Sequence, residues 1–289
     1  MKLKLNLVNP ESRSITDIKY TISKFPDGQQ SINIDQAIHE NDVIELSSRL
    51  SNFKDLELII CANMALRNLG VRKINLYVPF FLGARSDRKF TEGGINYLKD
   101  VICPIINSQK FKSVTILDAH SDVIEACIKN YKKIDNIKLV KFALTNIDNK
   151  NTARENLYLV SPDAGALKKV YNVAEHFKIE NLIIANKHRD IKTGKIVRTD
   201  VPGLTQEPGR RNFVIVDDIC DGGRTFLEIA KTIRYERNIS IFDDKIYLVV
   251  THGIFSTGFD ELKKHFDGIY CTNSVSDIDN ELVKQLNIF

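Results

Sequence analysis

Short apolar segments rich in β-branched residues alternate along the chain with longer stretches that have a helical period. Eight segments have the length and pattern of strands: Leu3–Val8, Asp42–Leu46, Ile74–Val78, Ser113–Leu117, Leu157–Val160, Asn181–Ala185, Phe213–Val216 and Lys245–Val250. Helical patterns lie between them at Leu56–Leu69, Gly94–Asn107, Gly165–His176 and Thr225–Arg237. This alternation predicts an α/β fold with largely parallel sheets, and so many strands suit two doubly wound domains better than one.

Two polar stretches interrupt the pattern. The segment LTNIDNKNTARE at 144–155 follows a short β-like run at Ile137–Lys141 and predicts a domain boundary, with domains at 1–144 and 145–289. The cation-rich stretch Lys187–Arg211 has Gly and Pro near its end, which predicts a long mobile loop or a β-flap. Loops of that length inside a compact domain are usually functional or disordered.

Composition narrows the class of protein. The 289 residues include 41 basic and 37 acidic side chains, a formal net charge of +4 that is too balanced to indicate a nucleic-acid-binding protein. Five cysteines at wide spacings predict reduced thiols, neither a disulfide framework nor a zinc site. The alternating start MKLKLNLVN is unlike a signal peptide, and no apolar run reaches the roughly 18 residues that span a bilayer. We therefore expect a cytoplasmic protein without a membrane segment.

The segment FVIVDDICDGGRTFL at 213–227 combines several features that bind phosphate and sugar groups. An apolar strand leads into Asp217 and Asp218, whose carboxylates can accept hydrogen bonds from a vicinal diol or reach a metal through water. The following glycines let backbone N–H groups approach a phosphate closely, and the helix predicted to begin at Thr225 adds free donors. Thr225 itself can cap that helix or donate to phosphate.

This segment resembles the ribose-phosphate binding motif shared by type I phosphoribosyltransferases and by phosphoribosyl-pyrophosphate (PRPP) synthetases, the ribose-phosphate diphosphokinases. The resemblance implies that the two adjacent aspartates hold the ribose hydroxyls. It assigns the 5-phosphate to the loop made of Asp221, Gly222, Gly223, Arg224 and Thr225.

Six further segments resemble the synthetases and occur in that family's order. They are Phe25–Gln29, Val78–Lys89, Leu117–His120, Val160–Gly165, Lys187–Arg189 and Val250–Ser256. The resemblance implies ATP-binding roles for Phe25, Asp27, Gln29, Arg85, Ser86, Asp87 and Arg88. It places His120 and Asp163 at the metal, and it makes Lys187 and Arg189 the catalytic cations of a flexible loop at about 187–211.

The family resemblance implies two domains of type I phosphoribosyltransferase-like fold, with ATP on the N-terminal side. It also implies an Mg²⁺-dependent enzyme that transfers the terminal diphosphate of ATP to the anomeric hydroxyl of ribose 5-phosphate. Catalysis of such a transfer rests mostly on alignment and charge stabilisation, without a covalent intermediate. Homo-oligomers, dimers or hexamers, are implied as well.

The phosphate loop departs from the family's Asp-Thr-Gly-Gly-Thr. Gly222 lacks the usual hydroxyl, and Arg224 replaces a glycine with a planar cation that could clamp a second phosphate. These changes suggest an alternative acceptor, ADP-ribose, whose 1-pyrophosphate could feed NAD synthesis. Gln29 replaces a usual acid near the adenine, and the segment after Lys89 lacks the Arg- and Ser-rich run of phosphate-activated synthetases.

Two other hypotheses stay open at this point. A non-catalytic paralogue that regulates an active synthetase should have lost metal or loop residues, whereas His120, Asp163 and the aspartate pair are present. A phosphoribosyltransferase that consumes PRPP would need no ATP-binding half, and the segments of the first half argue against it.

Overall fold

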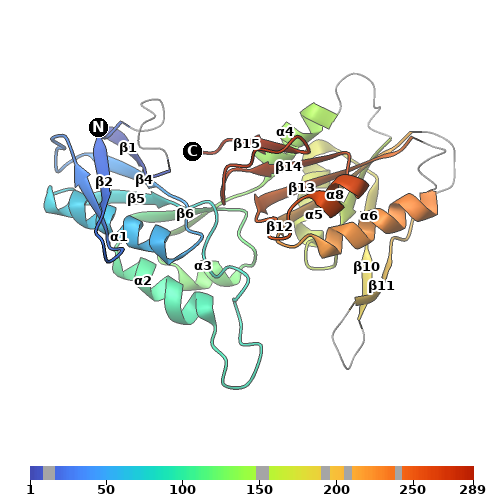
Figure 1. Ribbon diagram of the computed structural model, residues 1–289, viewed down its shortest axis with the longest axis horizontal. Helices are drawn as coiled ribbons and strands as arrows, with labels where there is room; N and C mark the ends of the chain where they lie inside the picture. The colour runs from blue at the N-terminus through green and yellow to red at the C-terminus, as the bar shows by residue number, and fades with distance from the viewer. Residues whose placement is uncertain (9–16, 148–155, 190–195, 205–209, 238–242) are drawn as a thin grey trace. The chain divides into compact units, whose positions relative to one another are not determined.

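The computed structural model describes residues 1–8, 17–147, 156–189, 196–204, 210–237 and 243–289 (Figure 1). The chain forms two compact units, Met1–Asp135 with Phe289, and Asn136–Ile288. Each unit is built on a parallel sheet, as the alternating pattern predicted. No helix among the described residues is long and apolar enough to cross a membrane.

The first unit has a five-stranded parallel sheet in the order β1-β4-β5-β6-β7. Its strands are β1 Lys2–Asn6, β4 Val43–Ser47, β5 Lys73–Tyr77, β6 Ser113–Leu117 and β7 Tyr131–Ile134. The connecting helices are α1 Phe53–Asn68, a π-helical turn Leu98–Ile102 that continues into α2 Cys103–Ser108, and α3 Val123–Cys127. An antiparallel hairpin of β2 Tyr20–Lys24 and β3 Gln30–Ile34 joins β1 to β4.

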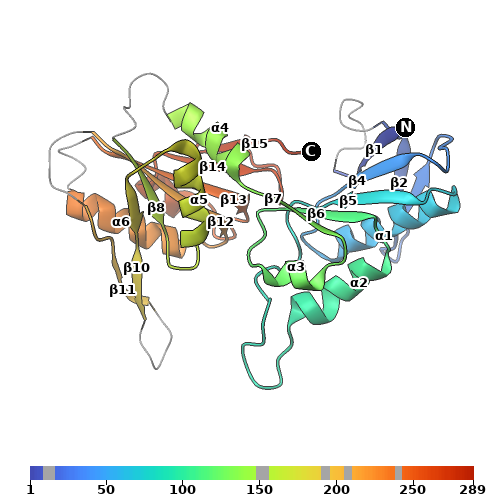
Figure 2. The same cartoon turned by 180° about the vertical axis from the view of Figure 1, so that it is seen from behind.

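Helices cover one face of this first sheet. From β4 to β7 each strand pairs with its successor in the chain, so right-handed crossovers place α1, α2 and α3 on the same side (Figure 2). Burial along the strands agrees, because Ile44 and Leu46 are buried while Glu45 between them is only half-buried.

The second unit has a six-stranded parallel sheet in the order β15-β14-β13-β12-β8-β9. Its strands are β8 Leu157–Ser161, β9 Leu182–Ile184, β12 Asn212–Cys220, β13 Lys245–Gly253, β14 Gly268–Thr272 and β15 Val283–Leu286. Its helices are α4 Ile137–Ile147, α5 Leu167–Phe177, α6 Arg224–Arg237 and α8 Asp260–His265.

Helices pack on both faces of the second sheet. Phe213 and Ile215 of β12 join the core formed with α6 and α8, whereas Val214 and Val216 join the core formed with α4 and α5. A strand covered on both sides reads as a continuous apolar run, and this explains FVIV at the start of β12.

Helix α4 corrects the predicted boundary. The run Ile137–Lys141 is helical, and the contacts divide the chain between Asp135 and Asn136, nine residues before the expected position after Leu144. Leu139, Val140 and Ala143 are buried with helical spacing, so their β-branched neighbours misled the strand prediction. The side chains of Thr145 and Asn146, in the last turn of this helix, donate back to the carbonyls of Lys141 and Phe142 at 2.8 Å each. The rest of the expected linker, 148–155, lies outside the described residues.

The five cysteines are all free, and three of them are buried, in agreement with the prediction of reduced thiols.

Candidate functional site

The aspartate pair lies within β12, near the carboxyl end of the central strand of the second sheet. Strand β12 lies between β13 and β8 and extends to Cys220, so both carboxylates project from regular strand. Asp218 is 5% exposed, and its backbone N–H donates to Oδ1 of Asp217 at 2.8 Å. Ligands of parallel α/β sheets bind beyond the carboxyl ends of the strands, where this pair stands.

Lys169 holds one member of the pair. Its Nζ lies 2.5 Å from Oδ2 of Asp218, and the two side chains are 20% and 7% exposed. Sequence reasoning missed Lys169, which is in the helical stretch after Ser161-Pro162-Asp163 and has no motif of its own. Only the packing of α5 beside β12 brings this ammonium to the pair.

The environment of Asp217 is strongly acidic. Burial, and then the negative charges of Asp218 and Asp163, raise the pKa of Asp217 to about 7, although the Asp218 N–H and Lys169 oppose the shift. Asp217 therefore changes charge near neutral pH, where a cation or a diol bound at the site would meet it.

A second loop clasps the predicted phosphate loop. Ser256 Oγ donates to Oδ1 of Asp221 at 2.5 Å, and Thr257 Oγ1 donates to the Gly222 carbonyl at 3.0 Å. Gly223 has φ +73°, a conformation that favours glycine, and a Cβ there would make a tight contact of 3.2 Å with the Leu262 side chain. The family-like segment Val250–Ser256 thus supports the loop from β13.

Helix α6 begins at Arg224, one residue before the expected start. Thr225 is therefore inside the first turn and is not the residue that precedes the helix, which corrects its predicted capping role. Arg224 is exposed at that helix start. The first-turn N–H groups of α6 follow the Gly222-Gly223 turn, as anion binding requires.

Asp163 fixes the turn that precedes α5, the helix whose N-cap residue is Ala166. Its Oδ1 accepts the N–H groups of Gly165 and Ala166 at 3.0 and 3.1 Å, and Ser161 Oγ donates to its carbonyl. Within the described part of the chain, no group of three or more His, Cys, Asp or Glu side chains could hold a metal ion. Mg²⁺ commonly binds through one or two carboxylates, substrate phosphates and water, so the carboxylate oxygens around Asp217 fit it without a protein cage.

The stretch expected as a mobile loop or β-flap contains an antiparallel hairpin of β10 Asn186–Arg189 and β11 Ile196–Asp200. Lys187 and Arg189 lie on the backbone of β10, opposite Thr199 and Ile196. Their side chains, and residues 190–195 and 205–209, lie outside the described part.

In the first unit, His120 follows β6 at the carboxyl end of the sheet and is exposed, so it is not a core histidine. Asp118 just before it is 3% exposed, has φ +43°, and donates its N–H to the Ile134 carbonyl at 2.7 Å. That unusual backbone conformation turns the chain sharply beyond β6.

The cationic segment follows β5 at the same edge of the first sheet. Arg85 and Arg88 are exposed, while Ser86 and Asp87 are half-buried. Hydrogen bonds to backbone carbonyls fix this segment: the Ser86 carbonyl accepts the Leu98 N–H at 3.1 Å, and the Asp87 carbonyl accepts from the side-chain amide Nδ2 of Asn96 at 2.6 Å. The guanidinium of Arg88 stacks over Phe90 at 5.6 Å.

Phe25, Asp27 and Gln29 form the tip of the β2–β3 hairpin. Phe25 is 51% exposed, and Asp27 Oδ1 accepts the Gln29 N–H at 3.1 Å. The hairpin is anchored on α1, because Gln30 Nε2 donates to the Lys54 carbonyl at 2.7 Å and to Glu57 at 3.1 Å. An exposed aromatic ring on an anchored hairpin can stack on a base.

Comparisons with known proteins agree with this arrangement. Residues 10–101 match the N-terminal domain of ribose phosphate pyrophosphokinase, and residues 128–241 match the phosphoribosyl transferase domain. Ribose-phosphate pyrophosphokinase of Mycoplasma genitalium is 24% identical over 95% of this chain and 81% of its own length. That of Maricaulis maris is 28% identical over 89% and 81%. The chain belongs to the ribose-phosphate pyrophosphokinase family.

The fold is shared with a solved structure. Phosphoribosylpyrophosphate synthetase from Mycobacterium smegmatis superposes with a TM-score of 0.76 at 17% identity, over 95% of this chain and 87% of that one. This likeness confirms the predicted fold class. The matches to the two domains and to the named relatives confirm the predicted kind of enzyme.

The raised pKa of Asp217 predicts that the free energy of unfolding depends on pH. The folded state keeps the Asp217 proton up to about pH 7, whereas an unfolded carboxyl loses it at 3.8. The folded state thus binds more protons in that window, so this group's contribution to the unfolding free energy falls as pH rises, by about 2–3 kcal/mol from pH 5 to 8. Denaturant titrations of wild type and Asp217→Asn at both pH values test this. From pH 5 to pH 8 the wild type should lose stability relative to the variant. Equal changes in the unfolding free energy of the two proteins would refute the raised pKa of Asp217.

Proposed function

We propose that this chain transfers the β,γ-diphosphate of ATP to the anomeric hydroxyl of ribose 5-phosphate, giving PRPP and AMP. The observation that carries the proposal is the aspartate pair beside a phosphate loop clasped by Ser256 and Thr257, at the carboxyl edge of the second sheet. Family membership supports ATP as the donor, because the relatives are named ribose-phosphate pyrophosphokinases. We place the reaction in the cytoplasm and expect a homo-oligomer.

Different residues bind the acceptor and stabilise the charge of the transferring group. Asp217 and Asp218 accept hydrogen bonds from the ribose hydroxyls, and residues 221–225 bind the 5-phosphate, so the anomeric oxygen is aimed at the β-phosphorus. A bond forms between the anomeric oxygen and the β-phosphorus. The bond from the β-phosphorus to the oxygen that it shares with the α-phosphate breaks, AMP leaves, and the hydroxyl proton passes to solvent. Lys187 and Arg189 neutralise charge on the transferring group.

The ATP side belongs to the first unit. Phe25 stacks on the adenine, Asp27 and Gln29 offer polar groups at its edge, and Arg85, Ser86 and Arg88 bind the phosphates. Asp87 belongs to the same ATP-binding segment. Asp163 and His120 would hold Mg²⁺, which when bound neutralises charge on the ATP phosphates.

Lys169 tests the role of the aspartate pair. Removing its ammonium leaves the buried carboxylate of Asp218 without this cation and beside the half-buried Asp217, so we expect Lys169→Met to raise the KM for ribose 5-phosphate about tenfold or more, with a smaller change in kcat. Lys169→Arg should restore most of the affinity. The exposed neighbour Lys168→Met is the control. Equal effects of the 168 and 169 variants in steady-state kinetics would contradict the assignment.

A second acceptor, ADP-ribose, is favoured by the phosphate loop itself. Arg224 is exposed at the start of α6, where it can reach a second phosphate. A Cβ at Gly222 would make only ordinary contact with Thr257 at 3.4 Å, so the missing side chain leaves space that the usual threonine would fill.

The deciding experiment is a product assay with Mg²⁺ and ATP, run separately with ribose 5-phosphate and ADP-ribose, reading AMP release and acceptor mass. A diphosphate gain on ribose 5-phosphate supports the proposal, and a gain mainly on ADP-ribose supports the alternative. In the second case Arg224→Gly should raise the KM for ADP-ribose about tenfold and spare ribose 5-phosphate. Inactivity with both acceptors would favour the regulatory paralogue.

A further inference from the structure

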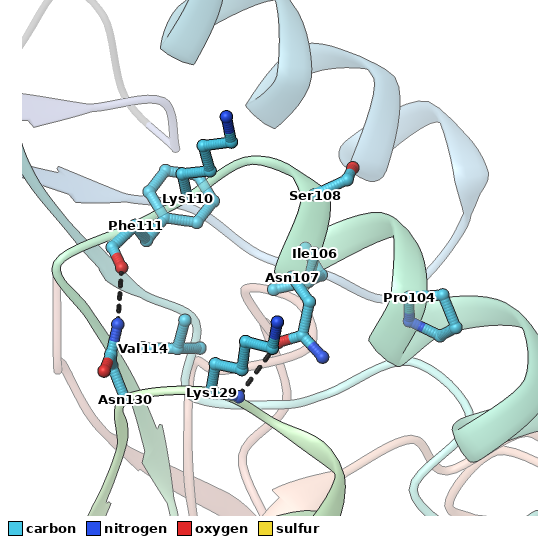
Figure 3. Close-up of a pocket in the computed structure, with 9 residues that line it drawn as sticks. All are labelled: Pro104, Ile106, Asn107, Ser108, Lys110, Phe111, Val114, Lys129 and Asn130. Carbon is cyan, nitrogen blue, oxygen red and sulfur yellow. Dashed lines mark hydrogen bonds between the residues drawn. The ribbon is translucent and has the colours of Figure 1, made fainter.

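A cavity of about 510 Å³ opens in the first unit between the end of α2 and the segment that precedes β7 (Figure 3). It is lined by Pro104, Ile106, Asn107, Ser108, Lys110, Phe111, Val114, Lys129 and Asn130. Its volume is in the range that accommodates small-molecule ligands. The candidate functional site uses none of these residues.

The cavity lies at the opposite edge of the sheet from the candidate site. Val114 is near the amino end of β6 and Asn130 immediately precedes β7, whereas His120 follows the carboxyl end of β6. Catalysis at the carboxyl edge therefore does not explain this cavity.

Hydrogen bonds within the chain hold the walls in place. Asn107 joins them, since its Nδ2 donates to the Cys127 carbonyl at 2.9 Å and its Oδ1 accepts the Lys129 N–H at 2.9 Å. Asn130 Nδ2 donates to the Phe111 carbonyl at 3.1 Å. Figure 3 shows two of these bonds, from Asn130 to Phe111 and from Lys129 to Asn107. The cavity is thus preformed, which lowers the entropic cost of binding.

The floor is apolar and fixed. Ile106, Phe111 and Val114 are 1%, 4% and 2% exposed and belong to the core of the first unit. A ligand that reaches this floor meets apolar side chains, which favour an apolar or aromatic body.

The rim is cationic. Lys110 and Lys129 stand on different walls (Figure 3), and in the described part of the chain neither forms an ion pair. Lys110 adopts φ +55°, a conformation at a helix end that favours glycine. The carbonyls at the end of α2 would repel an anion, but Arg67 donates to those of Gln109 and Lys110 at 3.0 and 2.9 Å.

We infer that this cavity binds a phosphate monoester with an apolar or aromatic body. Such an ester carries nearly two negative charges at neutral pH, which match the two ammonium groups, and its body would cover Phe111 and Val114. Neutral aromatic compounds lack the charge interaction with the two ammonium groups, and inorganic phosphate lacks the contact with the apolar floor.

The probe is phenyl phosphate, compared with inorganic phosphate and phenol on the full chain under saturating ATP. Chemical acetylation of lysines, read residue by residue by mass spectrometry, should show saturable protection of Lys110 and Lys129. Phenyl phosphate should protect at a concentration at least tenfold lower than phosphate. Lys112, which is exposed nearby but does not line the cavity, is the internal control.

Variants complete the test. The double variant Lys110→Gln/Lys129→Gln should lower phenyl phosphate affinity at this site at least tenfold in calorimetry, while Lys112→Gln should leave it unchanged. Because both lysines are exposed, the far-ultraviolet spectrum should match that of the wild type. Equal protection by phosphate or by phenol, equal protection of Lys112, or an equal loss in Lys112→Gln would overturn the inference.

Discussion

Replacing Arg237 by methionine is expected to lower the free energy of unfolding by about 3–5 kcal/mol. Arg237 lies in the last turn of α6 and is completely buried, with Nε 2.7 Å from Oδ2 of the equally buried Asp244. Oδ1 of Asp244 accepts the Arg211 N–H at 2.8 Å. Methionine fills much of the volume but leaves the Asp244 carboxylate buried without the guanidinium, and an uncompensated buried charge is costly.

The same helix provides a matched control for denaturant unfolding. Arg234 pairs with Asp267 at 3.2 Å, but those side chains are 28% and 23% exposed, so Arg234→Met should cost about 1 kcal/mol or less. Asp244→Asn added to Arg237→Met removes the stranded charge and keeps an acceptor for Arg211, so the double variant should recover part of the loss. Equal losses for Arg234→Met and Arg237→Met would contradict the burial argument.

Replacing Lys187 by alanine is expected to lower kcat about 10²–10³-fold while ATP affinity stays nearly constant. In the proposed function this ammonium acts on charge that develops during transfer, so its contribution is made mainly in the transition state. Lys187 lies at the beginning of the β10–β11 hairpin, directly beyond the second sheet. Single-turnover kinetics, together with equilibrium binding of ATP, separates the two quantities.

His188→Ala, at the next position of β10, is the control and should retain most of the turnover. A loss of ATP affinity with unchanged kcat would remove Lys187 from the catalytic role and make it a binding residue.

The sequence alone specified the parallel α/β class, because an apolar strand and an amphipathic helix each carry their own period. The chemistry of 213–227 was also visible in one continuous segment, since Asp217, Asp218 and the glycine turn are neighbours in the chain. The burial of β12 on both faces was readable too, because FVIV is an uninterrupted apolar run.

The local sequence pattern predicted the wrong element where the same residues suit both a strand and a helix. Ile137–Lys141 is apolar and β-branched enough for a strand, but packing against α5 and the second sheet makes it a helix. The hairpin carrying Phe25 was not expected as strands, because β2 and β3 are short and largely polar and are stabilised by contacts with α1.

What the sequence determined by itself was the period of the elements and the chemistry of contiguous motifs. Tertiary structure alone decided three pairs: Lys169 with Asp218, Ser256 with Asp221, and Arg237 at the end of α6 with Asp244. A charge or hydroxyl in a helix or loop has the same local pattern whether it faces solvent or a buried carboxylate. The difference lies in burial, which depends on how the helices pack on the sheet.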